Sequence, residues 1–228
     1  MSKYPQIVND ARALWRAIRL RGFSSSSDIT IPDQPAFDPE FDALFREEIQ
    51  KSEFYLEFGS GASTVLAAKA GVETICVESD QNYADAVRRK VGTGAPVTII
   101  HSDIGLTEEW GYPVFTRPSE TRHKRWRNYT EKAFAKIGQS NRFPDMILVD
   151  GRFRIACAMA SAHHAQKAKA SCTLYIDDYV GRPHYLVVED YLGSPEIIGR
   201  TACFSLVPGQ LKQEITHDLV HEFHKDFR

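Results

Sequence analysis

The stretch from Phe54 to Ala70 constrains the fold of this chain more than any other. An apolar, strand-forming run, Phe54 to Phe58, breaks at Gly59 and Gly61 and continues directly into a segment rich in alanine. This order predicts a strand, a tight turn and a helix. Glycine lets the backbone turn sharply and approach a ligand, and the first N–H groups of the new helix point toward that ligand. The stretch therefore predicts the start of a nucleotide-binding fold, although a purely structural turn explains the glycines alone equally well.

Glu78 ends a second predicted strand, which begins at Thr74. An acid about 20 residues beyond such a turn can accept the hydrogen bonds of a ribose diol. A dinucleotide-binding turn would have a third glycine where Thr64 stands, and the acid before the turn, Glu57, would repel a pyrophosphate. We therefore expect this turn to lie against a cation.

The block resembles motif I of the class I S-adenosylmethionine-dependent methyltransferases, whose acid-x-Gly-x-Gly loop lies under the methionine moiety of the cofactor. Glu57, Gly59 and Gly61 match this motif. The resemblance implies that Glu57, Gly59, Ser60 and Gly61 hold the methionine end of S-adenosylmethionine and that Glu78 binds the ribose.

Asp103 follows a third predicted strand, Val97 to Ile100. In the methyltransferase family an acid at this place commonly receives the adenine amino group, and a carboxylate is a suitable acceptor for it. The resemblance implies this role for Asp103. A helix cap or turn is the alternative explanation of the residue.

Three carboxylates, Asp150, Asp177 and Asp178, follow two further predicted strands, 145–150 and 174–176. The first of these strands is a continuous apolar run, which is typical of a parallel strand covered on both faces. Its carboxyl end, and that of its neighbour, is where open α/β sheets bind ligands. Like-charge repulsion makes the cluster costly unless a cation, a shared proton or an arginine compensates it.

This cluster resembles that of metal-dependent O-methyltransferases acting on sugars and phenols. The resemblance implies a Mg²⁺ ion held by Asp150, Asp177 and Asp178, with Asp150 and Asp178 orienting or deprotonating the acceptor. Some of those enzymes have another acid where this chain has Arg152. The alternative is therefore that Arg152 and Arg154 neutralise the carboxylates without metal.

Residues 105–141 lack clean periodicity and mix aromatic with basic side chains. We expect an insert or lid here that pairs with anionic groups of a small-molecule acceptor; a solvated surface excursion is the alternative. Single-stranded nucleic acid also suits such a mixture, but one basic segment in a chain of net charge −2 is too small a footprint for it. The side chains that carry this prediction are Trp110, Tyr112, Phe115, Trp126, Tyr129, Arg117, Arg122, His123, Lys124, Arg125 and Arg127.

The chain ends and the composition complete the expected organisation. Residues 1–50 should be a helical extension, with an amphipathic helix from Tyr4 to Leu20 that packs on the domain or joins a homodimer. Residues 51–228 should form the cofactor-binding domain and end in an antiparallel hairpin between Glu196 and Val207. His217, His221 and His224 have the spacing of metal ligands, but they border an apolar stripe, so we expect structural or solvent-facing roles.

The 228 residues, 43% of them hydrophobic, suffice for one domain, and no apolar run is long enough to span a membrane. The four cysteines are scattered singly and no secretory leader is evident, so we expect a cytoplasmic protein with reduced thiols.

The sequence thus predicts a Rossmann-like, doubly wound α/β sheet, mostly parallel with a C-terminal antiparallel strand. The function it predicts is methyl transfer from S-adenosylmethionine to a small molecule, with oxygen as the nucleophile. An NAD-dependent oxidoreductase and a methyltransferase-like domain that binds without turnover remain the two alternatives.

Overall fold

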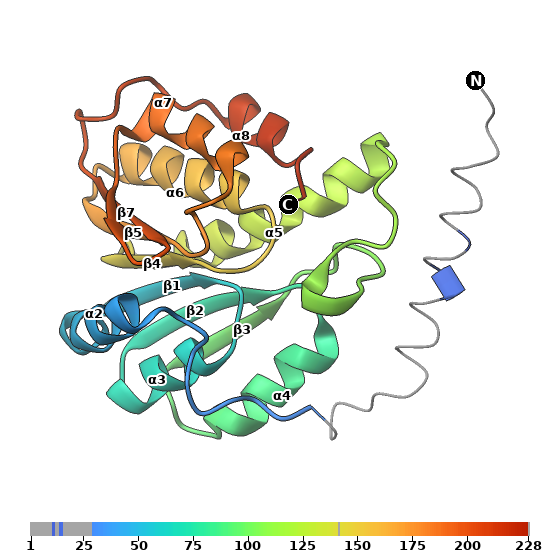
Figure 1. Cartoon of the computed structure of the whole chain (residues 1–228), viewed down its shortest axis with the longest axis vertical. Helices are drawn as coiled ribbons and strands as arrows, with labels where there is room; N and C mark the ends of the chain where they lie inside the picture. Colours follow the sequence, from blue (N-terminus) through green and yellow to red (C-terminus); the bar gives the residue numbers. More distant parts are fainter. Residues whose placement is uncertain (1–10, 12–13, 16–28, 141, 228) are drawn as a thin grey trace.

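The computed structural model describes residues 11, 14–15, 29–140 and 142–227, which are drawn as the coloured parts of Figure 1. Ala11, Leu14 and Trp15 are helical. The rest of the predicted helix from Tyr4 to Leu20 lies outside the described residues, so the predicted homodimer through this helix stays a prediction. No helix among the described residues has the length and apolarity that a membrane crossing requires.

A sheet of seven strands in the order β3-β2-β1-β4-β5-β7-β6 forms the centre of the molecule. Strands β1 to β5 are parallel, whereas β7 runs antiparallel to both β5 and β6. The predicted doubly wound sheet and its C-terminal antiparallel hairpin are therefore confirmed. The strands are β1 (Phe54–Phe58), β2 (Glu73–Glu78), β3 (Val97–His101), β4 (Met146–Val149), β5 (Cys172–Ile176), β6 (Glu196–Ile198) and β7 (Thr201–Leu206).

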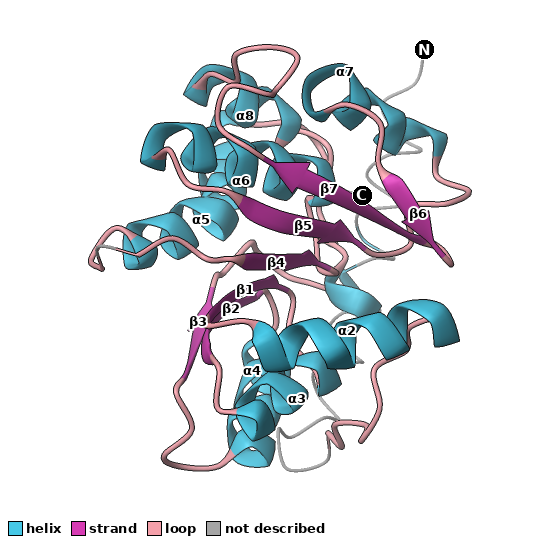
Figure 2. Ribbon diagram, turned by 90° about the vertical axis from the view of Figure 1, so that its left-hand side faces the viewer, coloured by secondary structure: helices cyan, strands magenta, loops and turns pink. Residues whose placement is uncertain are grey.

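Helices cover both faces of this sheet. Helices α2, α3 and α4 lie on one face, and α5, α6 and α8 lie on the other (Figures 1 and 2). The α-helices are α2 (Pro39–Lys51), α3 (Ala62–Ala70), α4 (Gln81–Val91), α5 (Glu120–Ile137), α6 (Arg154–Ala168), α7 (Glu189–Leu192) and α8 (His217–Phe223). Two short 3-10 helices, η2 (Glu109–Gly111) and η3 (Pro183–Val188), complete the described elements.

Alternation along β1 separates the two cores. Leu56 and Phe58 face the core that includes α5 and α6, while Tyr55 points to the opposite core beside Phe45 of α2. Every residue of β1 is buried because helices cover both of its faces. The strand order reverses at β1, which lies between β2 and β4, and ligands bind at the carboxyl ends of strands at such a point.

Helix α5 corrects the prediction of a lid over residues 105–141. Residues 120–137 form a regular helix, and its Trp126 and Tyr129 are only 1% exposed. Their rings pack against Phe153, so they fill the core instead of covering a ligand. Residues 105–119, before this helix, are irregular apart from η2.

The turn after β1 depends on Gly59, whose φ is +119°. A methyl group at this position would lie 3.2 Å from the backbone carbon of Asp150 and 3.2 Å from the nitrogen of Gly151. We predict that Gly59→Ala lowers the free energy of unfolding by about 1–3 kcal/mol, measured by urea denaturation. Gly71→Ala is the matched control, because Gly71 also has a positive φ, +73°, but no atom lies within 4 Å of the added methyl group. Equal losses in the two variants would show that the approach of the two backbones does not matter.

Candidate active site

The carboxyl ends of β1 and β2 are joined by hydrogen bonds around the glycine turn. The N–H of Gly59 donates to the carbonyl of Val77 over 2.9 Å, and the N–H of Gly61 donates to Oγ1 of Thr64 over 3.0 Å. Unlike Gly59, Gly61 has space beside it: the nearest atom to an added methyl group is the Tyr83 hydroxyl at 3.5 Å. The turn therefore lies tightly against the backbone after β4 at Gly59, whereas an added methyl group at Gly61 would make only an ordinary contact with Tyr83.

Glu57, the acid before the turn, is buried, and its side chain forms hydrogen bonds with other described residues. Its carboxyl group accepts hydrogen bonds from the hydroxyls of Ser63 and Thr64, the latter over 2.7 Å. Burial raises the pKa of Glu57 to about 8, although both hydroxyl donors oppose the shift. The group fastens the first turn of α3 to β1. Its predicted contact with a cofactor stays a prediction.

Glu78 connects the end of β2 to the same turn. One carboxyl oxygen accepts from the backbone N–H groups of Ser79 and Asp80, over 2.7 and 3.0 Å, while the other accepts from the Ser60 hydroxyl over 2.9 Å. Burial raises the pKa of Glu78, against the effect of these donors. One oxygen is therefore fixed by the backbone, and the second faces the glycine turn, where an incoming hydroxyl could take the place of Ser60.

Asp103 lies beyond β3 and is half exposed, with an ion pair to Arg125 and a hydrogen bond of 2.9 Å from the N–H of Gly105. Partial burial opposes a shift, but the Gly105 N–H and the Arg125 guanidinium together lower the pKa of Asp103. A hollow of about 310 Å³ opens beside this pair. Apolar and basic side chains line it, including Ile104, Leu106, Phe115, Arg122 and Arg125. Asp103, which is predicted to bind adenine, thus lies close to Arg122 and Arg125, which are predicted to bind the acceptor. The two groups do not lie at separate ends of the site.

Asp150 and Asp178, at the ends of β4 and β5, share the buried Arg154. Its guanidinium donates to Asp150 over 2.9 Å and lies 3.6 Å from Asp178. It also donates to the backbone carbonyls of Asp177 and Gly151, so it bridges the two strand ends. Burial raises the pKa of Asp150 to about 6, against the attraction of Arg154.

Two arginines that the sequence analysis missed complete this neutralisation. Arg182 donates to Asp178 over 2.6 Å, and Arg200 lies 2.8 Å from Asp178 and 3.3 Å from Asp177. Asp177 is 2% exposed and accepts a further hydrogen bond of 2.8 Å from the Thr201 hydroxyl. Arg182 follows Asp178 by four residues, so the sequence spacing could have predicted this pair. Arg200 belongs to the C-terminal hairpin, and no local sequence pattern indicates its pairing with the aspartates.

The predicted metal site is not favoured by this arrangement. Among the described ranges, Asp150, Asp177 and Asp178 do not form a group whose ligand atoms lie within 4.8 Å of one another. Arginines supply the compensating charge, as the alternative expectation held. Arg154 is one of them, whereas Arg152, which directly follows Gly151, is not. The Mg²⁺ assignment therefore stays a prediction without support from the geometry.

Arg152 lies against η2 and, among the described residues, forms no ion pair with the aspartates. It is 5% exposed, and its Nε and Nη1 atoms have no hydrogen-bond partner among the described residues. Its guanidinium lies 4.0 Å from the ring centre of Tyr112. Gly111 passes so close to Ser79 that an added methyl group would lie 2.7 Å from its hydroxyl, so η2 covers the ends of β2 and β4.

Backbone strain is concentrated at this edge of the sheet. Trp110, Phe153 and Asp178 all have φ between +53° and +60°, which costs a residue with a side chain about 1–3 kcal/mol. Each lies in a connection that follows the carboxyl end of a strand. Strain of this kind accumulates at functional sites, and Trp110 is in addition 85% exposed above the edge.

The chain is similar in sequence and structure to a methyltransferase-like protein. No family model and no curated protein matches the sequence. A methyltransferase-like protein from Silicibacter pomeroyi is 32% identical in a solved structure that matches 86% of this chain and 100% of its own, with a TM-score of 0.72. A 16S rRNA methyltransferase from Thermus thermophilus is 11% identical over 78% of this chain and 42% of its own, with a TM-score of 0.38. A SAM-dependent methyltransferase from Agrobacterium tumefaciens is 12% identical over 73% of this chain and 60% of its own, also with a TM-score of 0.38. The similarities to these last two proteins are too low to indicate a substrate.

Arg154→Met tests whether arginine, and not a metal ion, holds the aspartates together. We predict a loss of about 2–4 kcal/mol in the free energy of unfolding, because Asp150 and Asp178 lose a shared buried donor. Arg142→Met, which removes exposed pairs with Glu53 and Glu73, should cost less than about 1 kcal/mol. The wild-type melting temperature should be the same in Mg²⁺ and in EDTA. A rise in Mg²⁺ that disappears in EDTA would restore the metal site.

Proposed function

This chain belongs to the family of methyltransferase-like proteins, and we propose that it transfers the methyl group of S-adenosylmethionine to a small-molecule acceptor. We propose an oxygen atom as the nucleophile. The observation that carries the proposal is the Glu57–Gly61 turn, tied by Ser60 to Glu78 at the reversal point of the sheet. The reaction asks the protein mainly to align a nucleophile and to accept its proton.

The residues at the sheet edge suit this cofactor. The oxygen of Glu78 that faces the turn is available to ribose hydroxyls in exchange for the Ser60 hydroxyl. We propose that Asp103 accepts a hydrogen bond from the adenine amino group, which requires Arg125 to share this carboxylate or to move aside. When bound, the cofactor supplies a methyl group on a sulfonium.

The acceptor side of the proposal rests on Asp150 and on Arg152. A carboxyl group with a pKa of about 6 is suited to take a proton near neutral pH, and Arg154 fixes its position. Asp178 would orient the acceptor from the neighbouring strand end. Nε and Nη1 of Arg152, which have no hydrogen-bond partner among the described residues, favour an acceptor that carries a carboxylate or phosphate group, because unpaired donors on a buried guanidinium are costly. The hydrogen bond between Arg152 and Tyr112 satisfies only part of this guanidinium.

Two competing functions lead to different measurements. An NAD-dependent oxidoreductase would bind NAD and not S-adenosylhomocysteine in calorimetric titration. A non-catalytic domain would bind S-adenosylhomocysteine but transfer no radiolabelled methyl group to any acid in a panel of small carboxylates and phosphates. Binding of S-adenosylhomocysteine together with transfer is the outcome that we expect.

Glu78→Ala tests the cofactor half of the site. We predict that S-adenosylhomocysteine binds about 1–3 kcal/mol more weakly, because the ribose loses a charged hydrogen-bond acceptor. Glu73→Ala, at the beginning of the same strand, is the matched control and should bind as the wild type does. Unchanged affinity in a folded Glu78→Ala variant would show that this acid does not bind the cofactor.

Arg152→Gln tests the acceptor half. We predict an increase of about tenfold or more in the KM for the acceptor, since a charge-assisted bond is lost, with unchanged affinity for S-adenosylhomocysteine. The exposed Arg117 serves as the control through Arg117→Gln, which should alter neither quantity. If Arg152→Gln instead weakens S-adenosylhomocysteine and leaves the KM for the acceptor unchanged, this arginine belongs to the cofactor site.

A further inference from the structure

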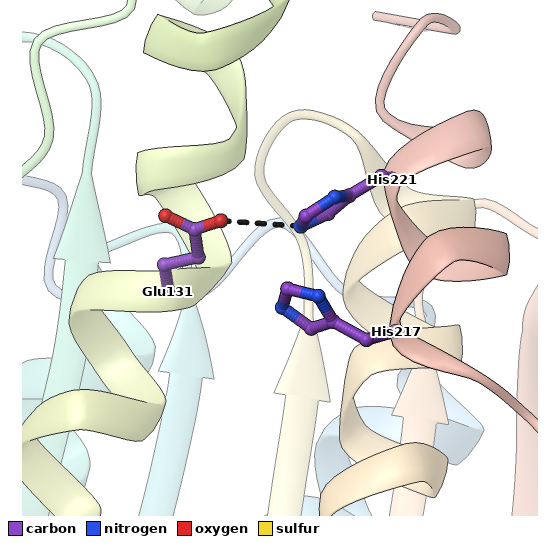
Figure 3. Close-up of side chains that lie close together, drawn as sticks. All are labelled: Glu131, His217 and His221. Carbon is purple, nitrogen blue, oxygen red and sulfur yellow. Dashed lines mark hydrogen bonds and ion pairs between the residues drawn. The ribbon is translucent and has the colours of Figure 1, made fainter.

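A second cluster of chemically capable side chains lies between α5 and α8. Glu131 comes from α5, while His217 and His221 come from successive turns of α8, and all three side chains point toward one another (Figure 3). One ligand atom from each residue lies within 4.8 Å of the other two. None of the three takes part in the function proposed above.

The attachment of α8 to α5 does not explain the cluster. His224 already provides it, since this fully buried side chain contacts the Thr130 hydroxyl over 3.0 Å and the Val220 carbonyl over 2.9 Å. The structural role expected for His224 is thereby confirmed. His217, by contrast, is exposed and has ring contacts with His163 and His221. The attachment of α8 to α5 therefore does not explain the position of His217.

The separation of Glu131 and His221 suits a tetrahedral ion. Nε2 of His221 lies 3.2 Å from Oε1 of Glu131, and two ligands of a tetrahedral zinc ion are about 3.3 Å apart. Histidines four residues apart project from the same side of a helix, as in known zinc sites. Two imidazoles and one carboxylate form a ligand set that zinc accepts, with water in the fourth position. We propose that Glu131, His217 and His221 bind a Zn²⁺ ion that fastens α8 to α5.

Arg127 opposes the binding of this ion. Its guanidinium lies 3.1 Å from Nδ1 of His221, and since arginine only donates, the ring must carry its hydrogen on Nε2. Zinc binds where that hydrogen is, so Nδ1 must take up the hydrogen and Arg127 must turn away. A glutamine at position 127 would offer a carbonyl to Nδ1–H, the partner that metal-bound histidines usually have. Arg127→Gln should therefore tighten zinc binding.

Isothermal titration calorimetry tests the proposal. Zinc is titrated in a reducing buffer into the full chain, prepared without a polyhistidine tag. We expect one saturable site in the wild type and a loss of affinity of at least about tenfold in His217→Ala and in Glu131→Gln. His101→Gln, which removes a histidine from the end of β3, is the control and should bind as the wild type does. His217 is exposed, so its replacement should leave the fold intact.

Thermal melting gives a second readout. Zinc should raise the melting temperature of the wild type and of His101→Gln but not that of His217→Ala, because an ion that binds the folded chain and not the unfolded chain stabilises it, and His217→Ala removes a ligand. Absence of saturable zinc binding would overturn the proposal. So would equal affinity in the wild type and His217→Ala, which would place the ion elsewhere, for example at the partly buried Cys203.

Discussion

The arrangement of the candidate active site depends on how closely two backbones approach. The chain leaving β1 at Gly59 meets the chain leaving β4 at Gly151, and a methyl group on Gly151 would lie 2.9 Å from the Phe58 carbonyl and 2.2 Å from the Tyr129 hydroxyl. Two glycines are thus required by packing within the protein, whatever ligand the turn accepts. This approach brings Glu57, near the end of β1, and Asp150, after β4, to the same edge of the sheet. Glu78, which ends β2, and the aspartates after β5 lie at that edge too.

That edge would be unstable if its carboxyl groups were all ionised without partners. The protein uses different solutions along the edge. Glu57 is buried with hydroxyl donors and has a raised pKa, whereas Glu78 is bonded to backbone N–H groups. The aspartates after β4 and β5 are paired with arginines. Charge compensation of this kind keeps the acids close to one another, and it leaves Nε and Nη1 of the buried Arg152 without a hydrogen-bond partner among the described residues.

The sequence was sufficient for the sheet and for the placement of most acids, because both follow from local patterns. Continuous apolar runs mark the parallel strands, and the acids directly follow them. The error over Trp126 and Tyr129 has a physical cause: a crossover helix that covers a sheet needs large apolar side chains on one face, and basic residues on its other face conceal the period. The direction of Arg152, the involvement of Arg200 and the pairing of Asp103 with Arg125 were not readable, because each depends on segments that meet only in the folded chain.

Arg200 also has a consequence for the order in which the molecule assembles. It belongs to the turn between β6 and β7, and it pairs not only with Asp177 and Asp178 but also with Asp38, at the start of α2. The last hairpin of the sheet thereby joins a segment that is synthesised more than a hundred residues earlier. Until that hairpin emerges from the ribosome, the acids at the end of β5 lack one of their cations, and the nascent chain has every parallel strand but an incomplete site. Contacts of such large sequence separation form late because their loop must close first, so this edge should be the last part of the protein to become rigid.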